Sequence, residues 1–162
     1  MQIEKANTAM QSLLEAARGA PSQLDTDLES YLQSGFLIEP DGAVVSAASG
    51  CFGPSERASF DDRVGYETFV NKIHIEDWGS EALWTATTEE MIGQALVLAD
   101  AVGDWATNNG VSVAVIVSAD PANRDVVFRF HGIRPTERPW LHEDLEGYAE
   151  PVLLRIYGDN NN

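Results

Sequence analysis

The segment from 88 to 108 carries the longest periodic pattern of apolar residues in the chain, and it predicts a single long helix. Its apolar side chains recur at helical spacing: Met91, Ile92, Ala95, Leu96, Leu98, Ala99, Val102, Trp105 and Ala106. Thr87 and Glu90 have the spacing of a capping box at its start. Asn109 and Gly110 follow its end, where they tolerate left-handed backbone. An apolar face this wide indicates a helix that lies flat on a sheet.

Strand patterns lie on both sides of this helix. The residues from 111 to 117 are almost continuously apolar and mostly β-branched, which predicts a central strand covered on both faces. From 126 to 131 apolar and polar side chains alternate, so we expect a half-exposed strand there. The segments 66–75 and 152–157 are also predicted to be strands.

Two helices and a hairpin are expected in the first third of the chain. Apolar residues at helical spacing predict a helix from 2 to 18, and Ser22 is expected to cap a second one. The short apolar runs 36–38 and 43–47 flank the turn sequence Glu-Pro-Asp-Gly and predict a β-hairpin.

These elements together predict an α+β fold in one domain spanning residues 1–157, which suits a chain of 162 residues. Residues 1–34 would form a helical N-terminal part, and residues 36–157 would form the sheet and its central helix. The sheet is expected to be mainly antiparallel, with about five to six strands, because strands arrive in hairpin-length groups around one long helix. Residues 158–162 are expected to be a disordered tail.

The cysteine content and the hydropathy pattern favour a cytoplasmic protein. Cys51 is the single cysteine, so no intramolecular disulfide can form, as suits a reducing compartment. The first residues lack the basic and apolar regions of a secretory signal. No stretch approaches the ~18 consecutive apolar residues of a membrane-spanning helix. We therefore expect no membrane association.

The charge of the chain is its most unusual bulk property. Twenty-six carboxylates face ten Lys and Arg residues, which gives a net charge of −16. There is no basic residue between Lys72 and Arg124, although this stretch contains many carboxylates. Such a surface repels nucleic-acid phosphates and speeds encounter with basic partners. We expect a basic protein partner and no direct nucleic-acid binding, while acidity that only improves solubility is the alternative.

No residue pattern indicates a catalytic or cofactor site strongly. His74 and Glu76 would share a strand face and could form a general-base pair, but such surface pairs are common. His131 and His142 have no compact zinc-ligand spacing. Cys51 lies in a glycine-flanked loop with no base nearby to activate it. Phosphate-binding glycine motifs are absent as well. The sequence therefore predicts no catalytic residue, no cofactor and no metal.

The basic residues Arg124, Arg129, Arg134 and Arg138 are close together in the sequence. They could bind an anion or an acidic partner. We expect instead that they pair internally with neighbouring acids, which are abundant.

Two tryptophans and several carboxylates are candidates for a binding surface just before the long helix. Trp78 and Trp84 bracket a short connection rich in acidic residues, and buried aromatic anchors dominate the energetics of many protein interfaces. We call the predicted set the tryptophan surface: Glu76, Asp77, Trp78, Glu81, Trp84, Glu89 and Glu90. The alternative is that both rings cap the edge of the sheet.

These features lead to a hypothesis of an acidic, inhibitor-type binding protein. In size, acidity and lack of cofactor motifs the chain resembles the immunity proteins that neutralise nuclease toxins of bacteria. The resemblance is one of general character, and it implies no residue roles. One alternative is a phage-type DNA mimic that blocks a DNA-binding defence protein. Another is a small enzyme or accessory subunit, with a site built on His74 or His131 and carboxylates.

Overall fold

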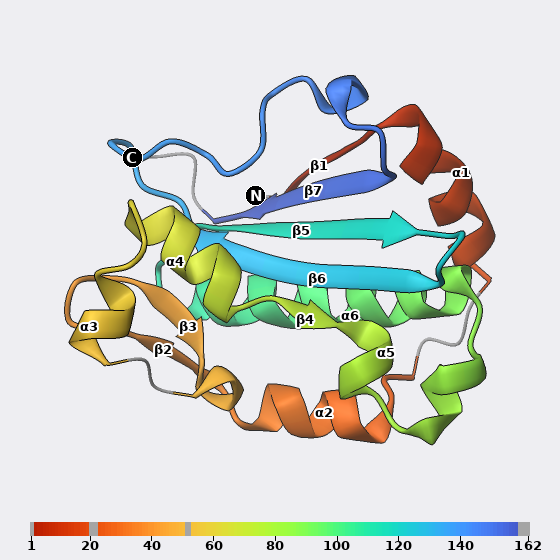
Figure 1. The fold of residues 1–162 in the computed structure, drawn as a ribbon, viewed down its shortest axis with the longest axis horizontal. Coiled ribbons are helices and arrows are strands. Elements are labelled where there is room, and N and C mark those ends of the chain that lie inside the picture. The colour runs from red at the N-terminus through yellow and green to blue at the C-terminus, as the bar shows by residue number, and fades with distance from the viewer. Residues whose placement is uncertain (1, 20–22, 51–52, 159–162) are drawn as a thin grey trace.

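A computed structural model describes residues 2–19, 23–50 and 53–158 of the chain. Its centre is a five-stranded sheet in the order β1-β7-β5-β6-β4, with every neighbouring pair antiparallel (Figure 1). These strands are β1 (Gln2–Ala6), β4 (Ile73–His74), β5 (Val113–Asp120), β6 (Asp125–Gly132) and β7 (Val152–Tyr157). A separate hairpin pairs β2 (Phe36–Ile38) with β3 (Val44–Ser46). The predicted α+β class and antiparallel sheet are confirmed.

Helices surround this sheet, and the longest of them lies behind it in the view of Figure 1. The α-helices are α1 (Thr8–Ala17), α2 (Thr26–Gln33), α3 (Pro54–Arg57), α4 (Arg63–Val70), α5 (Ile75–Trp78) and α6 (Thr88–Asn108). Short 3₁₀ helices are η1 (Ala47–Ser49), η2 (Glu81–Thr85) and η3 (Leu145–Gly147). Within the described residues, none of the helices combines the length and apolar character needed to cross a membrane.

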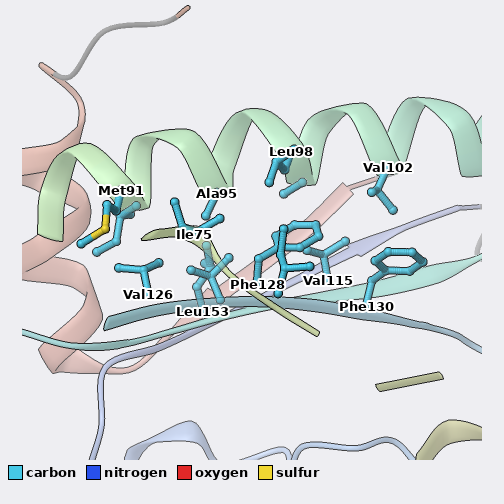
Figure 2. Close-up of a cluster of buried hydrophobic side chains, with 14 of the residues drawn as sticks. Ile75, Met91, Ala95, Leu98, Val102, Val115, Val126, Phe128, Phe130 and Leu153 are labelled. Atoms are coloured by element: carbon cyan, nitrogen blue, oxygen red, sulfur yellow. The ribbon is translucent and has the colours of Figure 1, made fainter. Parts of the chain in front are cut away.

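The long helix α6 has the predicted bounds and the predicted start. The Thr87 side chain accepts a hydrogen bond from the backbone N–H of Glu90, and the Glu90 carboxylate accepts one from the N–H of Thr87. Its apolar face packs on the sheet, where Leu98 and Val102 lie above Phe128 and Phe130 of β6 (Figure 2). This interface forms the main hydrophobic core.

The strand β5 is central, as the β-branched run predicted. It lies between β6 and β7, with Val115 opposite Phe130 on one side and Arg155 on the other. Its Val115 side faces α6, whereas Ile116 on the other side is buried beneath Leu145. The strand β6 was predicted to be half-exposed, but it is more buried than that. Most side chains on each of its two faces are buried.

The prediction of a helix from residue 2 is wrong, because residues 2–6 form the edge strand β1. Ile3 lies opposite Ile156 of β7. The first residues therefore form the edge of the sheet and do not belong to a helical N-terminal part. The helix α1 begins only after Asn7, whose side chain accepts a hydrogen bond from the N–H of Met10. Pairing with a distant strand has overridden the local helical spacing of these residues.

The predicted strand from 66 to 75 is also wrong. Its first half, residues 66–70, belongs to the helix α4, capped by Asp62, whose carboxylate accepts a hydrogen bond from the N–H of Gly65. Only Ile73 and His74 pair with β6, and α5 follows immediately. Short apolar runs do not separate helix from strand by periodicity alone.

The second predicted helix exists as α2, but it begins later than expected. Asp25 caps it by accepting a hydrogen bond from the N–H of Asp27. The cap predicted at Ser22 lies outside the described residues, and so does the predicted tail 158–162 except for Gly158. The predicted hairpin is confirmed, and its strands β2 and β3 form a second, small sheet.

Candidate functional site

The tryptophan surface is built from α5, η2 and the start of α6, next to α2. Asp25, the cap of α2, also accepts hydrogen bonds from the N–H and hydroxyl of Ser80, at 2.9 and 2.6 Å. The hydroxyl of Ser80 in turn accepts from the N–H of Ala82 at the start of η2. The ring of Trp78 meets the ring of Tyr31 edge-on, with centroids 5.3 Å apart. These contacts fix η2 and α5 against α2.

The two tryptophans of this surface differ in exposure. Trp84 is 59% exposed and Trp78 is 38% exposed, because Trp78 partly packs on α2. Beside Trp84 lies a hollow of about 230 Å³. It is lined by Glu76, Asp77, Leu83, Trp84, Met91, Asn123 and Arg124. Trp84 is therefore the more available anchor for a partner.

The carboxylates of the tryptophan surface fall into two groups. In the part of the chain that the structure describes, Asp77, Glu81 and Glu89 form no ion pair. Glu90 is used by the helix cap, and Glu76 is turned toward His74. The first three carboxylates thus keep their charge available to a partner.

One basic residue also reaches this surface. Arg124 occupies the turn between β5 and β6 and donates a hydrogen bond from Nη2 to the backbone carbonyl of Trp84, at 2.9 Å. The stretch between Lys72 and Arg124 contains no Lys or Arg, but the surface that it forms includes the side chain of Arg124. Arg124 could not be foreseen there, because it lies 40 residues from Trp84.

At the hairpin end of the molecule the carboxylates are paired. Arg57 forms ion pairs with Glu39 and Asp41, and Arg63 forms one with Glu137 at 2.6 Å. Arg57 also lies over the ring of Tyr66. Among the described residues, these carboxylates therefore have cationic partners within the protein, unlike Asp77, Glu81 and Glu89 of the tryptophan surface.

The most buried ion pair of the described chain joins Glu67 of α4 to Arg134. Glu67 has no exposed surface, and its carboxylate accepts hydrogen bonds from the N–H groups of Val44 and Gly132 and from the Arg134 guanidinium, at 2.6 Å. Arg134 also pairs with Glu137. No sequence motif around Glu67 indicates its burial.

Asn71 continues this linkage one turn further along. Its side-chain amide donates to the carbonyls of Val44 and Phe130, at 2.8 and 3.1 Å, and its oxygen accepts from the N–H of Ser46. Two polar side chains at the end of α4 therefore connect the hairpin strand β3 to β6.

The four predicted arginines do not form one cluster. Arg134 is paired internally, as the second interpretation expected, and Arg124 lies on the tryptophan surface. Arg129 is half-buried, its Nε has no hydrogen-bond partner among the described residues, and desolvation lowers its pKa. Arg138 is exposed.

His131 lies on β6 beside a hollow of about 220 Å³ lined mainly by apolar side chains. Its Nδ1–H donates to the carbonyl of Gly132 at 2.8 Å, so Nε2 is left as an acceptor in the neutral ring. Burial lowers the pKa of His131 below its ordinary value of 6.5. His142 is exposed on the segment after β6, and its Nδ1 accepts from the N–H of Asp144.

The free energy of unfolding should fall as the pH drops from about 7 to about 5.5. The unfolded chain takes up a proton on His131 near its ordinary pKa of 6.5, whereas the folded protein resists protonation. The slope due to one such group is at most about 1.4 kcal/mol per pH unit. Urea titration at several pH values should show a smaller slope for His131→Gln than for the unaltered protein. An unchanged slope in His131→Gln would refute this explanation.

A second group of titratable residues meets at the end of β4. His74 Nδ1 lies 2.7 Å from Asp125 Oδ1 and 3.7 Å from Glu76 Oε1. The other oxygen of Glu76 accepts from the N–H of Val126, at 3.4 Å. Desolvation and, to a smaller extent, the nearby Asp125 raise the pKa of Glu76. The proposed pairing of His74 with Glu76 is thus present, but Glu76 belongs to α5 rather than to a strand.

The structure adds Asp125 to this pair, which the sequence interpretation missed. Asp125 begins β6, 51 residues after His74, and the antiparallel pairing of β4 with β6 brings the two together. No spacing rule connects residues so far apart. Cys51 lies outside the described residues.

Comparison with known proteins and protein families gives one match, which is to a family model. A family model described as the Uncharacterized protein PM0498 family matches residues 5–161. No curated protein and no solved structure matches the chain significantly. The matched region begins within β1 and runs past β7, so it covers the other four strands of the sheet, the hairpin and all the helices described above. The chain belongs to the Uncharacterized protein PM0498 family.

Proposed function

We propose that this protein binds a basic surface of a partner protein through the tryptophan surface. The observation that carries the proposal is Trp84, which is 59% exposed on a surface where Asp77, Glu81 and Glu89 form no ion pair within the described residues. An exposed aromatic ring supplies contact area that slows dissociation, and unpaired carboxylates speed association with a basic partner.

The charge arrangement supports a protein partner. At the hairpin end the carboxylates Glu39, Asp41, Glu67 and Glu137 are paired with Arg57, Arg63 and Arg134, whereas Asp77, Glu81 and Glu89 of the tryptophan surface form no ion pair within the described residues. An exposed indole has no counterpart in a phosphate backbone, which favours this proposal over the DNA-mimic alternative.

The biological role that fits such a surface best is that of an inhibitor. A nuclease-like toxin has a basic groove for phosphates, and an immunity protein with a preformed acidic surface can occupy that groove quickly. We expect the protein to act in the cytoplasm, since its single cysteine suits a reducing compartment.

Association and dissociation should respond to different substitutions. Trp84→Ala should speed dissociation about 30-fold, equivalent to about 2 kcal/mol, because an anchor ring is lost. Asp77→Lys and Glu81→Lys should mainly slow association, and this effect should shrink at 1 M salt, where the Debye length is ~3 Å. The measurement is surface-plasmon resonance against a basic protein captured from the native host and then purified.

Matched controls lie on the segment between β6 and η3. Trp140 is 47% exposed, and Glu143 is exposed as well. Trp140→Ala and Glu143→Lys should leave both rate constants unchanged. If these controls weaken binding while the variants of the tryptophan surface do not, the interface lies elsewhere and the proposal fails.

A further inference from the structure

Three side chains that commonly ligate metals converge at one edge of the sheet. They are His74 at the end of β4, Glu76 in α5 and Asp125 at the start of β6, and one ligand atom of each lies within 4.8 Å of the others. We propose that these three residues bind one divalent transition-metal ion. This inference does not depend on the proposed function, and it departs from the expectation, drawn from the sequence, of no metal.

The distances suit a small cation. Zinc takes nitrogen and oxygen ligands at about 2.0–2.2 Å, so neighbouring ligand atoms of a tetrahedral site lie roughly 3.2–3.6 Å apart. His74 Nδ1 is 3.7 Å from Glu76 Oε1 and 2.7 Å from Asp125 Oδ1. Shifts of less than about 1 Å, within reach of side-chain rotation, would bring both pairs into that range.

The backbone holds the ligands in place without a metal. His74 lies opposite Val127 in the antiparallel pair of β4 and β6, which fixes it near Asp125. The helix α5 begins at the next residue, and the N–H of Val126 hydrogen-bonds to the oxygen of Glu76 that does not face His74. Each ligand therefore comes from an ordered element, so little conformational entropy is lost on binding.

The charges of the cluster favour binding of a cation, although Asp125 also interacts electrostatically with the half-buried Arg129. Two carboxylates face each other across one imidazole, and like charges this close destabilise each other. Across the described ranges, neither Glu76 nor Asp125 forms an ion pair with an arginine or lysine. Arg124, which also lines the hollow beside Glu76, donates to the carbonyl of Trp84 instead. A bound dication would neutralise both carboxylates.

The ligand set indicates the class of metal. An imidazole with two carboxylates suits zinc and similar transition metals, whereas Ca²⁺ and Mg²⁺ prefer oxygen ligands alone. Three protein ligands leave at least one coordination position free, as in sites where a metal holds water or a small ligand. The ligand side chains are 26–35% exposed, and hollows of about 230 and 530 Å³ adjoin Glu76 and Asp125 respectively.

Calorimetric titration of the purified protein with Zn²⁺ tests the proposal. We expect one ion per chain and much weaker binding of Ca²⁺. His74→Ala, Glu76→Gln and Asp125→Asn should each weaken Zn²⁺ binding by more than about 100-fold, because even the partners that orient ligands are worth 10–100-fold. His142→Ala removes an exposed histidine outside the cluster and should leave binding unchanged.

A spectrum of the unaltered protein gives a second readout, and the response of one histidine in it does not depend on the folding of a variant. Zn²⁺ should shift the imidazole ¹⁵N resonances of one histidine, and His74→Ala, where it folds, identifies that histidine as His74. The proposal is overturned if no stoichiometric Zn²⁺ binds, if His74 does not respond, or if Ca²⁺ competes equally. The last result would indicate diffuse attraction of cations to an acidic surface.

Discussion

Replacing Glu67 with alanine should lower the free energy of unfolding by about 3–5 kcal/mol, the usual cost of removing one partner of a buried ion pair. The carboxylate is fully buried, so its loss leaves the N–H groups of Val44 and Gly132 without their acceptor and removes one of the two carboxylate partners of Arg134. Urea titration measures the change.

Two controls make this expectation specific. Glu4→Ala removes an exposed partner of Arg155 and should cost no more than about 1 kcal/mol. The double variant Glu67→Ala, Arg134→Ala should cost less than the sum of its two single variants, because they remove one shared interaction. A cost below about 1 kcal/mol for Glu67→Ala would show that this pair does not hold the hairpin to the sheet.

Leu98→Ala should destabilise the protein by about 2–5 kcal/mol, because it opens a cavity in the main core. Leu98 has no exposed surface and lies between α6 and the sheet (Figure 2). Leu96 lies at the edge of the apolar face of α6 and is partly exposed. Leu96→Ala should therefore lower the free energy of unfolding less than Leu98→Ala does. Denaturant titrations that found both changes near neutral would contradict the assignment of this core.

The elements that could be predicted are those specified by their own residues. The helix α6 has a cap, a wide apolar face and a stop within one segment, and it occurs as expected. The alternation in β7 and the turn sequence between β2 and β3 are equally local. In residues 2–6 and 63–70 the local pattern is ambiguous, and distant partners decide the outcome: β7 for the first segment and β6 for the second.

The same limit applies to the candidate sites. The residues of the tryptophan surface lie in one stretch of sequence, so their proximity could be predicted, and their role in binding stays a prediction. The partner of Glu67 is 67 residues away, and Asp125 is 51 residues from His74. Such pairs become neighbours only through the order of strands in the sheet, which no local pattern contains.

The side chains of Glu67 and Asn71 have a consequence for self-association. The strand β4 covers β6 only as far as Phe128, so the N–H of Gly132 and the carbonyl of Phe130 would otherwise be open to a strand of another molecule. Glu67 and Asn71 form hydrogen bonds with these two groups. They also form hydrogen bonds with the N–H and the carbonyl of Val44 in β3. A substitution at either position would therefore expose two strand edges, and its first sign in a concentrated solution would be aggregation before any loss of helical content.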